Sequence, residues 1–294
     1  MVKLLGSEDY DLTILDNLSS GHKDSVVRGD LIIGDLADKN LLKKIFKDSD
    51  FDLVMHFASF IDVAESVREP NKYYENNVIN TLNLLNVMIE ENVRNFVFSS
   101  TAAIFGEPEY VPIDENHPKN PINTYGRSKL VVEQILDDYR TAFGLNYACL
   151  RYFNAAGADP EGEIGERHKN ETHLIPLILQ AASGRRDSIS LFGSDYDTDD
   201  GTCIRDYIHV NDLCQAHLLS INYLLTEKKS ISLNLGNGEG FSVQQVIDEA
   251  KRLTGSNFKV IKEDRRDGDP AILVADSSLA KQKLKWVPKY YKLE

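Results

Sequence analysis

The residues with the clearest chemical potential are Tyr125 and Lys129, a Tyr-x-x-x-Lys pair at the start of a segment with helical periodicity. Residues four apart lie on one face of a helix, one turn above the other. A neighbouring ammonium and the positive end of the helix dipole both favour the phenolate over the phenol. The pair therefore predicts a tyrosine base with a lowered pKa, although the spacing alone also fits an amphipathic surface pair.

A hydroxyl side chain, Thr101, follows the strand-like run Asn95 to Ser100, 24 residues before Tyr125. Ligands of open parallel α/β sheets bind at the carboxyl ends of the strands. A strand-end hydroxyl followed by Tyr-x-x-x-Lys at the opening of the next helix is the arrangement of short-chain dehydrogenases and reductases. This context favours catalysis over a surface pair.

Short apolar runs alternate with longer helical stretches, which predicts a parallel α/β sheet with right-handed crossovers. The expected strands are Leu12 to Leu15, Leu31 to Ile33, Leu53 to Phe57, Phe96 to Phe98 and Tyr147 to Tyr152, and the expected helices are Leu36 to Lys47, Tyr73 to Asn92 and Tyr125 to Phe143. We expect a Rossmann-like, doubly wound NAD-binding domain over residues 1–154. A smaller α/β domain over 155–294 would bind substrate, with residues 206–226 packing back on the first domain.

Composition excludes several classes of protein. The net charge of −13 and the lack of long basic clusters argue against a nucleic-acid partner. No apolar run approaches the roughly 18 residues of a membrane span, so a membrane protein is not expected and the cytoplasm is the expected location. The three cysteines lie far apart, which is typical of small buried residues rather than a disulfide or zinc frame.

Three further features are interpreted as structural. The Gly236 to Gly240 run lacks the third glycine spacing of a phosphate loop and is expected to form a strand-to-helix turn in the second domain, before a helix that Ser242 caps. His209 lies in an apolar run and is expected in the core. His168 and His173 lie in a charged loop without metal-ligand spacing, so no metal site is predicted.

The chain resembles UDP-glucose 4-epimerases, which are extended short-chain dehydrogenases, along nearly its whole length. The resemblance is carried by Asp16-Asn17-Leu18-Ser19-Ser20-Gly21, His56-Phe57-Ala58-Ser59, Glu65-Ser66-Val67, Tyr73-Tyr74-Glu75-Asn76-Asn77, Ser99-Ser100-Thr101-Ala102-Ala103, Arg151-Tyr152-Phe153-Asn154, Gly184-Arg185-Arg186-Asp187, Arg205-Asp206-Tyr207-Ile208-His209-Val210 and Arg266-Asp267-Gly268-Asp269-Pro270.

The resemblance implies interconversion of UDP-glucose and UDP-galactose, in galactose metabolism, by transient oxidation at C4 with tightly held NAD. Tyr125 would be the base on the sugar O4 hydroxyl, Lys129 would contact the nicotinamide ribose, and Thr101 would position the same proton. The other cofactor residues that it implies are Asp16, Asn17, Leu18, Ser19, Ser20, Gly21, Asp35, Leu36, Phe57, Ala58, Asn76 and Phe153. The other substrate residues are Asn154, Phe192, Arg205, Tyr207, Arg266 and Asp269. Relatives of this kind are often homodimers.

The chain departs from the family pattern in two ways. Leu273 stands where a bulky Tyr narrows the sugar pocket of some relatives, so we expect room for an N-acetyl group. In dinucleotide-binding folds, the acid that closes the second strand lies ~20 residues after a Gly-rich turn that binds phosphate. Asp16 is the corresponding acid here, and no Gly-rich turn precedes it in the sequence. We therefore expect that the first strand and the Gly-rich loop are missing. Either the natural chain extends beyond both ends, or the molecule lacks its pyrophosphate site.

Two alternatives stay open beside the epimerase. One is a dehydratase or decarboxylase of nucleotide sugars on the same scaffold. A dehydratase usually has an Asp-Glu pair after the strand-end hydroxyl, and Ala102 and Ala103 occupy those places. The other alternative is an inactive, truncated sugar-nucleotide binder.

Overall fold

The centre of the molecule is a parallel sheet of four strands in the order β10-β5-β4-β3. The computed structural model describes residues 1–266 and 268–293. The strands are β3 (Val54–His56), β4 (Asn95–Thr101), β5 (Asn146–Tyr152) and β10 (Ile231–Leu235). In the β4–β5 register Thr101 lies beside Tyr152, so the strand-end hydroxyl and the Phe153-Asn154 segment share one edge of the sheet.

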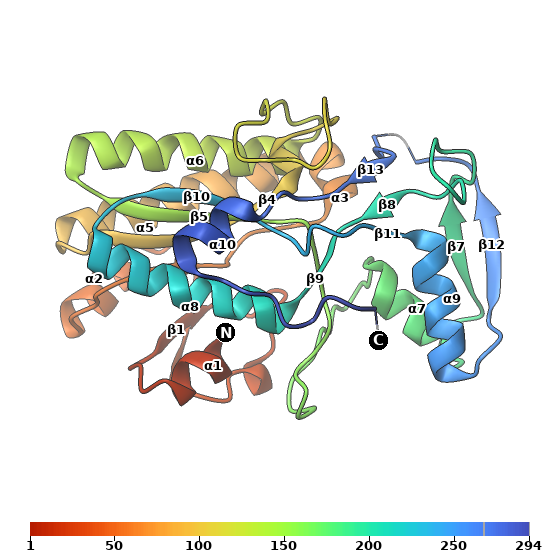
Figure 1. Cartoon of the computed structure of the whole chain (residues 1–294). Helices are drawn as coiled ribbons and strands as arrows, with labels where there is room; N and C mark the ends of the chain where they lie inside the picture. The colour runs from red at the N-terminus through yellow and green to blue at the C-terminus, as the bar shows by residue number, and fades with distance from the viewer. Residues whose placement is uncertain (267, 294) are drawn as a thin grey trace.

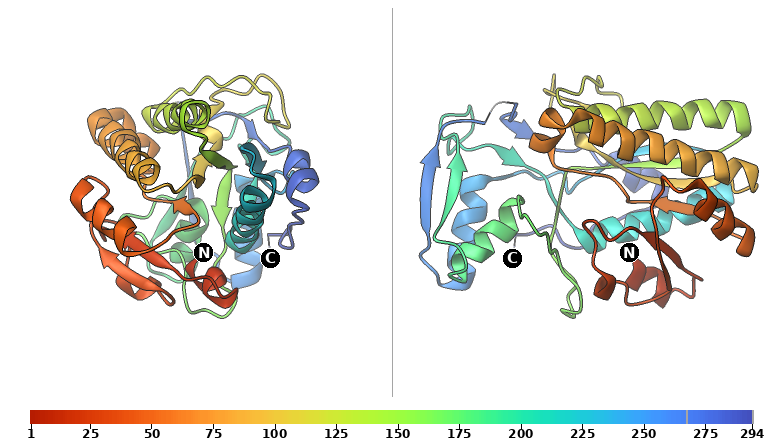
Figure 2. Two further views of the ribbon diagram at one scale, coloured as in Figure 1. Left: turned by 90° about the vertical axis from the view of Figure 1, so that its left-hand side faces the viewer. Right: turned by 180° about the vertical axis from the view of Figure 1, so that it is seen from behind.

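Helices cover both faces of this sheet, as the alternating sequence pattern predicts (Figures 1 and 2). One face packs against α2 (Lys39–Asp48), α5 (Asn80–Glu90) and α6 (Thr124–Phe143), and the other against α8 (Val210–Glu227) and α10 (Ser278–Leu284). Successive β4 residues serve opposite faces: Phe96 and Phe98 join the first core and Val97 the second. No helix in residues 1–266 or 268–293 is long and apolar enough to cross a membrane.

The predicted helix from Tyr73 to Asn92 is three consecutive segments. These are α4 (Pro70–Tyr74), a π-helical turn (Glu75–Ile79) and α5, and α3 (Val63–Arg68) precedes them. π-helical turns insert one extra residue and are frequent at functional sites. Here the turn contains Asn76 and Asn77, whose side chains face the segment that follows β3.

Strands β1 (Thr13–Asp16) and β2 (Asp30–Ile33) form a separate parallel pair. Within the described residues β1 pairs only with β2, and β3 pairs only with β4. One edge of β1 and one edge of β3 therefore have no strand partner, which agrees with the expected lack of the first strand. Helix α1 (Val2–Ser7) packs its Leu5 against Leu218 and Ile221 of α8.

The second lobe contains a parallel pair of strands, two helices and short connecting strands (Figure 1). Its elements are α7 (Leu174–Ala182), β7 (Ser188–Phe192), α9 (Val243–Thr254) and β12 (Lys259–Glu263), and the connecting strands are β6 (Asn154–Ala156), β8 (Ile204–Arg205), β9 (Tyr207–His209), β11 (Phe241–Ser242) and β13 (Ile272–Leu273). Two short 3-10 helices lie over Lys23–Ser25 and Ala102–Ile104.

The chain crosses between the lobes more often than a single boundary near residue 155 implies. Helix α8 packs on the first sheet, in agreement with the expected return of residues 206–226. The placement of the Gly236 to Gly240 turn in the second domain is corrected, because the preceding strand β10 pairs with β5 in the main sheet. Helix α10 and the fully buried Trp286 also join that core.

The Gly236 to Gly240 run is a strand-to-helix turn, as predicted, and its amides are already bonded. The Asp206 carboxylate accepts hydrogen bonds from the backbone N of Asn237 at 2.7 Å and of Gly238 at 3.0 Å, so these amides hold a protein carboxylate. Ser242 then caps α9 in a capping box with Gln245.

Candidate active site

Helix α6 presents Tyr125 in its first turn, beside the carboxyl end of β4. Asn123 caps the helix by accepting a hydrogen bond from the Gly126 N at 2.8 Å. A Cβ at Gly126 would lie only 2.4 Å from the Ala103 carbonyl oxygen, so glycine is what lets the helix approach the turn after Thr101. The Tyr125 side chain forms a hydrogen bond with that of Thr101. The structure therefore brings together the predicted base and the strand-end hydroxyl.

Lys129 is buried one turn further along α6, with only 1% of its surface exposed. Its Nζ donates hydrogen bonds to Ser59 Oγ and to the Ser99 carbonyl oxygen, both at 2.8 Å. It lies 4.7 Å from the ring centroid of Phe98 and 6.0 Å from that of Tyr125. Burial lowers the pKa of Lys129 to about 7, because the ammonium loses its hydration and gains no carboxylate partner at hydrogen-bond distance.

The predicted lowering of the Tyr125 pKa is not what the ligand-free chain shows. Burial raises the pKa of Tyr125, and the hydrogen bond with Thr101 only partly opposes this effect. Burial is the larger effect, and the Lys129 ammonium, on which the prediction relied, donates its hydrogen bonds to Ser59 and Ser99. A phenolate here needs a further positive charge beside the tyrosine.

Three residues that were not predicted as site residues hold this arrangement in place. Ser59 receives Lys129, Ser66 Oγ accepts from the Tyr125 N at 3.1 Å, and Asn77 donates to Ser128 Oγ at 3.0 Å. All three stand in sequence stretches that carry the family resemblance. Their roles were not readable from spacing, because each acts across 50 or more residues of chain.

A buried ion pair connects α6 to the strand next to Thr101. Arg151 of β5 donates to both carboxylate oxygens of Glu133 on α6 at 2.9 and 2.8 Å, and Ser100 Oγ donates to Glu133 at 2.6 Å. A buried bidentate pair fixes the relative position of its two elements, because separating the partners would leave a buried charge without a counter-ion. It joins α6 to β5 at Arg151, one residue before the Thr101–Tyr152 pair of the sheet.

The residues expected to bind the adenosine part of the cofactor form one turn after β1. The Asp16 carboxylate accepts from the Leu18 N at 2.7 Å, and Asn17 donates its side-chain NH to Asp35 at 2.7 Å and accepts from the Ser19 N at 2.9 Å. A Cβ at Gly21 would lie 2.9 Å from Asp16 Oδ2, so this glycine leaves the carboxylate accessible. Ser20 lies exposed in the same turn, and the Leu36 carbonyl accepts from Asn83 at 3.4 Å.

A strip of exposed apolar residues continues from this turn along the carboxyl ends of the strands. Ile33 after β2 is 59% exposed and Phe57 after β3 is 48% exposed. Next to them Asn76 donates to the Ala58 carbonyl at 3.3 Å. An acid for a ribose hydroxyl, followed by apolar surface for flat rings, fits the adenosine half of a dinucleotide. Lys129, Tyr125 and Phe153 fit its nicotinamide half, whereas the described residues offer no Gly-rich turn for its pyrophosphate.

The substrate-side candidates converge on a second edge. The Asn154 N donates to the Asp206 carbonyl at 2.9 Å, which sets Asn154 beside buried Tyr207 in the β6–β9 register. Asp269 contacts two arginines, Arg205 at 3.5 Å and Arg266 at 2.8 Å.

The guanidinium of Arg266 lies 4.8 Å from the ring centroid of Phe192. Two arginines that share one carboxylate retain a positive charge, which suits a diphosphate. Asp267, named in the same stretch, lies outside the described residues.

Leu273 connects the two groups of residues. It packs with Phe153 and Leu130 against a buried cluster of Ala102, Ile104, Phe105 and Ile113. Its carbonyl accepts from the Asp206 N at 3.0 Å, next to Arg205 and Tyr207. The sequence position expected to limit the sugar pocket therefore lies between the Thr101 end of the site and the arginines.

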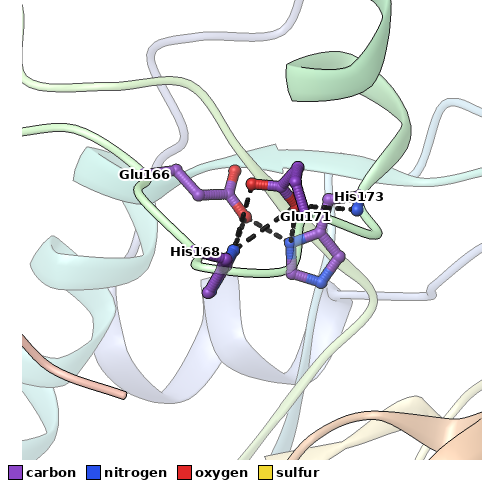
Figure 3. Close-up of side chains that lie close together, drawn as sticks. All are labelled: Glu166, His168, Glu171 and His173. Carbon is purple, nitrogen blue, oxygen red and sulfur yellow. Dashed lines mark hydrogen bonds and ion pairs between the residues drawn. The ribbon is translucent and has the colours of Figure 1, made fainter.

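One cluster of potential metal ligands lies in the loop before α7, where the spacing predicted no metal site. Glu166, His168, Glu171 and His173 place one potential ligand atom each within 4.8 Å of the others (Figure 3). Spacing did not indicate this, because the loop folds back on itself to bring the four side chains together.

Comparison with known proteins agrees with this geometry. The NAD dependent epimerase/dehydratase family matches residues 1–236. A UDP-glucose 4-epimerase of Halalkalibacterium halodurans is 49% identical over 293 residues, which cover 100% of this chain and 88% of the relative.

Two solved structures are also similar. The UDP-glucose 4-epimerase of Brucella ovis in complex with NAD is 46% identical, with a TM-score of 0.97 over 99% of this chain and 90% of that one. The UDP-Glc/GlcNAc 4-epimerase of Campylobacter jejuni is 42% identical, with a TM-score of 0.86 over 99% of this chain and 91% of that one.

The chain belongs to the NAD dependent epimerase/dehydratase family. Within it, these relatives place the chain among the UDP-glucose 4-epimerases, and the fold is the Rossmann-like α/β fold of their structures.

Proposed function

We propose that this protein interconverts UDP-glucose and UDP-galactose by transient oxidation at C4 of the hexose, with NAD as its cofactor. The observation that carries the proposal is the placement of Thr101, Tyr125 and Lys129 at the carboxyl end of the central strands, beside two arginines suited to a diphosphate. The similarity to UDP-glucose 4-epimerases over the full chain supports the same substrate pair.

Thr101, Tyr125 and Lys129 have separate roles in this reaction. Tyr125 takes the proton from the sugar O4 hydroxyl and later returns it, and Thr101, hydrogen-bonded to Tyr125, positions that proton. Lys129 donates to a ribose hydroxyl of the cofactor. When bound, NAD would supply the oxidation and reduction at C4.

On the substrate side, Arg205 and Arg266 bind the diphosphate, and Phe192 offers a ring for stacking. Asn154 and Tyr207 line the neighbouring edge. Asp16 and the turn through Gly21, with Asp35 and Leu36, hold the adenosine end of NAD, and Phe57, Ala58 and Asn76 hold its middle. These residue roles rest on geometry and on matching positions.

The direct test is a product analysis with purified protein, NAD and UDP-galactose. We expect UDP-glucose at equilibrium with the starting sugar, with no net change in NAD, because the electrons taken from C4 return to C4. Chromatography with mass detection distinguishes this result from dehydration, which gives a product lighter by one water. Loss of water, or net reduction of NAD, would contradict the proposal.

We also propose that the sugar pocket accepts N-acetylated UDP-hexoses. Leu273 is the support, because it packs beside Phe153 and is smaller than the Tyr that stands at this position in some relatives. Replacing Leu273 with Tyr should reduce turnover of UDP-N-acetylglucosamine by roughly 10- to 200-fold and leave UDP-galactose turnover nearly unchanged. Steady-state rates on both substrates measure the ratio.

Leu273→Met, which nearly conserves volume, is the matched control and should change neither rate much. A wild-type rate on UDP-N-acetylglucosamine about a thousandfold below that on UDP-glucose would refute the pocket assignment, since a pocket contact of this kind accounts for less than that.

We propose in addition that the protein is a cytoplasmic homodimer that associates through α5 and α6. These helices lie side by side, linked by the Tyr139 hydroxyl donating to Asn86 at 2.6 Å (Figure 2). Exposed apolar residues, Ile79 and Phe143, stand at their ends, where a second copy would cover them. Three free cysteines support a reducing compartment.

A further inference from the structure

Four side chains with metal-binding chemistry point at one another in the loop that connects β6 to α7. They are the carboxylates of Glu166 and Glu171 and the imidazoles of His168 and His173, and Figure 3 shows them gathered around a common centre. The loop lies in the second lobe, and none of the four residues belongs to the catalytic group described above.

Two of the distances between ligand atoms, those from His168, are close to those of a tetrahedral site. His168 Nδ1 lies 3.2 Å from Glu171 Oε2 and 3.5 Å from Glu166 Oε1. His173 Nδ1 lies 3.9 Å from Glu171 Oε1 and contacts Glu166 Oε1 directly. Ligand atoms bound to one tetrahedral zinc ion at its usual bond lengths stand about 3.3–3.6 Å apart. The four groups need only small adjustments to share one ion.

The cluster gathers two carboxylates whose side-chain partners are imidazoles. The Glu171 side chain is only 7% exposed, and within the described residues neither Glu171 nor Glu166 has an ion pair with a lysine or arginine. A second acidic cluster in the same loop provides the contrast: Lys3 lies 2.6–3.1 Å from Asp159, Glu161 and Glu163. One cluster has a lysine at its centre, and the other has only two imidazoles.

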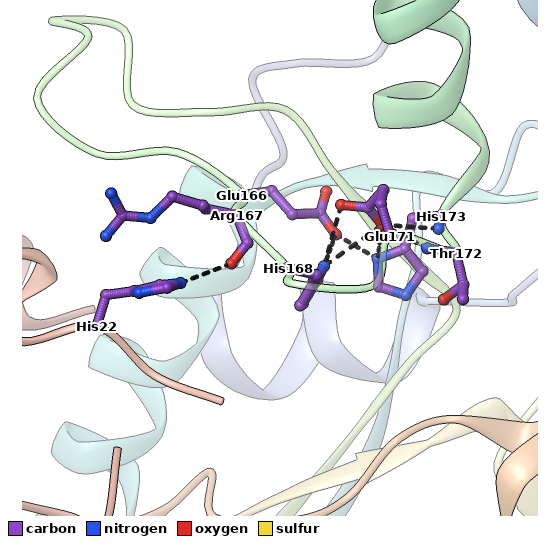
Figure 4. A network of polar contacts seen from close by, with 7 residues as sticks. All are labelled: His22, Glu166, Arg167, His168, Glu171, Thr172 and His173. Carbon is purple, nitrogen blue, oxygen red and sulfur yellow. Dashed lines mark hydrogen bonds and ion pairs between the residues drawn. The ribbon is translucent and has the colours of Figure 1, made fainter. Parts of the chain in front are cut away.

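Backbone hydrogen bonds also hold the Glu171 carboxylate in a fixed orientation. Its Oε1 accepts hydrogen bonds from the backbone N of Thr172 and of His173, both at 2.8 Å, which leaves Oε2 directed at His168 (Figure 4). Ordered outer contacts of this kind orient the ligands of metal sites.

We propose that Glu166, His168, Glu171 and His173 form a binding site for a divalent cation of the zinc class. Two imidazoles with two carboxylates suit Zn²⁺, and Co²⁺ or Ni²⁺ as substitutes, whereas Mg²⁺ and Ca²⁺ favour oxygen ligands alone. Four protein ligands close the site to substrate, so the ion has a structural role.

The ion would brace a connection between the two lobes. His173 immediately precedes α7, so one ligand is tied to the start of that helix. Arg167, between two of the ligands, pairs with Asp24, and its carbonyl lies 3.1 Å from His22 Nε2 (Figure 4). His22 follows the turn from Asp16 to Gly21, so the braced loop reaches the segment expected to hold the adenosine ribose.

The test is a zinc titration of the purified chain without a polyhistidine tag, after a chelator has removed bound metal. We expect one Zn²⁺ per chain with a Kd of about 1 µM or tighter, and a melting temperature that rises with added zinc. The Co²⁺-loaded protein should show the intense visible absorption of a tetrahedral site. His168→Asn should weaken zinc binding by about 100-fold or more and remove the thermal response.

Two further variants make the result decisive. Glu171→Gln keeps an acceptor oxygen for the backbone amides but removes the charge, and it should show the same loss if His168→Asn folds poorly. His22→Asn removes a nearby imidazole outside the cluster and should leave zinc affinity unchanged. Wild-type protein without stoichiometric zinc, or unchanged affinity in His168→Asn and Glu171→Gln, would overturn the proposal.

Discussion

Replacing Tyr125 with Phe should lower the rate of UDP-galactose conversion by about 10²- to 10⁴-fold and leave UDP-sugar binding nearly intact. The phenol ring is kept, so packing at the first turn of α6 is unchanged, and only the group that moves the O4 proton is removed. Thr101 cannot replace it, because its hydroxyl is a far weaker base and already accepts from the Ala103 N at 3.1 Å. Steady-state kinetics and UDP-sugar titration measure the two quantities.

Tyr139→Phe is the matched control for this experiment. Tyr139 lies on the same helix, and its hydroxyl bonds to Asn86 on α5, away from the sheet edge. Its loss should leave turnover within about twofold, as is usual for surface changes. If Tyr125→Phe retained most of the wild-type rate, the proton would have to move through another group, and the assignment of the base would be wrong.

Replacing Lys129 with Met should abolish most turnover and also stabilise the ligand-free chain at pH 6. The folded chain holds this lysine with a pKa of about 7, whereas the unfolded chain has the ordinary value of 10.5. Between pH 7 and pH 10.5 the unfolded chain therefore binds the extra proton, so stability from this group rises with pH. Below pH 7 the full cost of burying the ammonium applies, on the order of 5 kcal/mol.

Methionine removes that cost and also removes the hydrogen bonds to Ser59 and Ser99. With about 1–3 kcal/mol assigned to those lost bonds, a net gain of roughly 2–4 kcal/mol is expected at pH 6. Denaturant unfolding of both chains from pH 6 to pH 10 should show the advantage of Met shrinking as pH rises.

Lys43→Met, at an exposed lysine paired with Glu90, is the control and should change stability by less than about 1 kcal/mol at any pH in this range. A Lys129→Met chain less stable than wild type at pH 6 would show that the burial cost is overstated. It would also place Lys129 among the residues that hold the sheet together.

Most of the first lobe could be predicted from the sequence, because its elements depend on local patterns. Runs such as Phe96 to Phe98 are apolar on successive residues and so belong to strands buried on both faces, and Asn123 and Gly144 mark the ends of α6. The Tyr125–Lys129 pair was equally readable, because its spacing is set by the helix itself.

The features that were missed depend on contacts between distant parts of the chain. The apolar run of β10 has the same pattern whichever lobe it joins, and only pairing with β5 decides. The pKa of Tyr125 depends on how deeply the folded chain buries it, and the clustering of Glu166, His168, Glu171 and His173 depends on how one loop folds back. No local spacing encodes these outcomes.

The hydrogen bonds of Asp206 bear on how the sugar specificity of this fold can change. Its buried carboxylate accepts from the backbone of Asn237, Gly238 and Ala275, and its own N donates to the Leu273 carbonyl. The backbone from the carbonyl of residue 273 to the N of Ala275 is thus held in place by main-chain bonds, whichever side chain occupies position 273. If Leu273 limits the sugar pocket as proposed, natural or laboratory evolution can exchange this one residue, and with it the range of sugars, without moving the backbone that Asp206 holds.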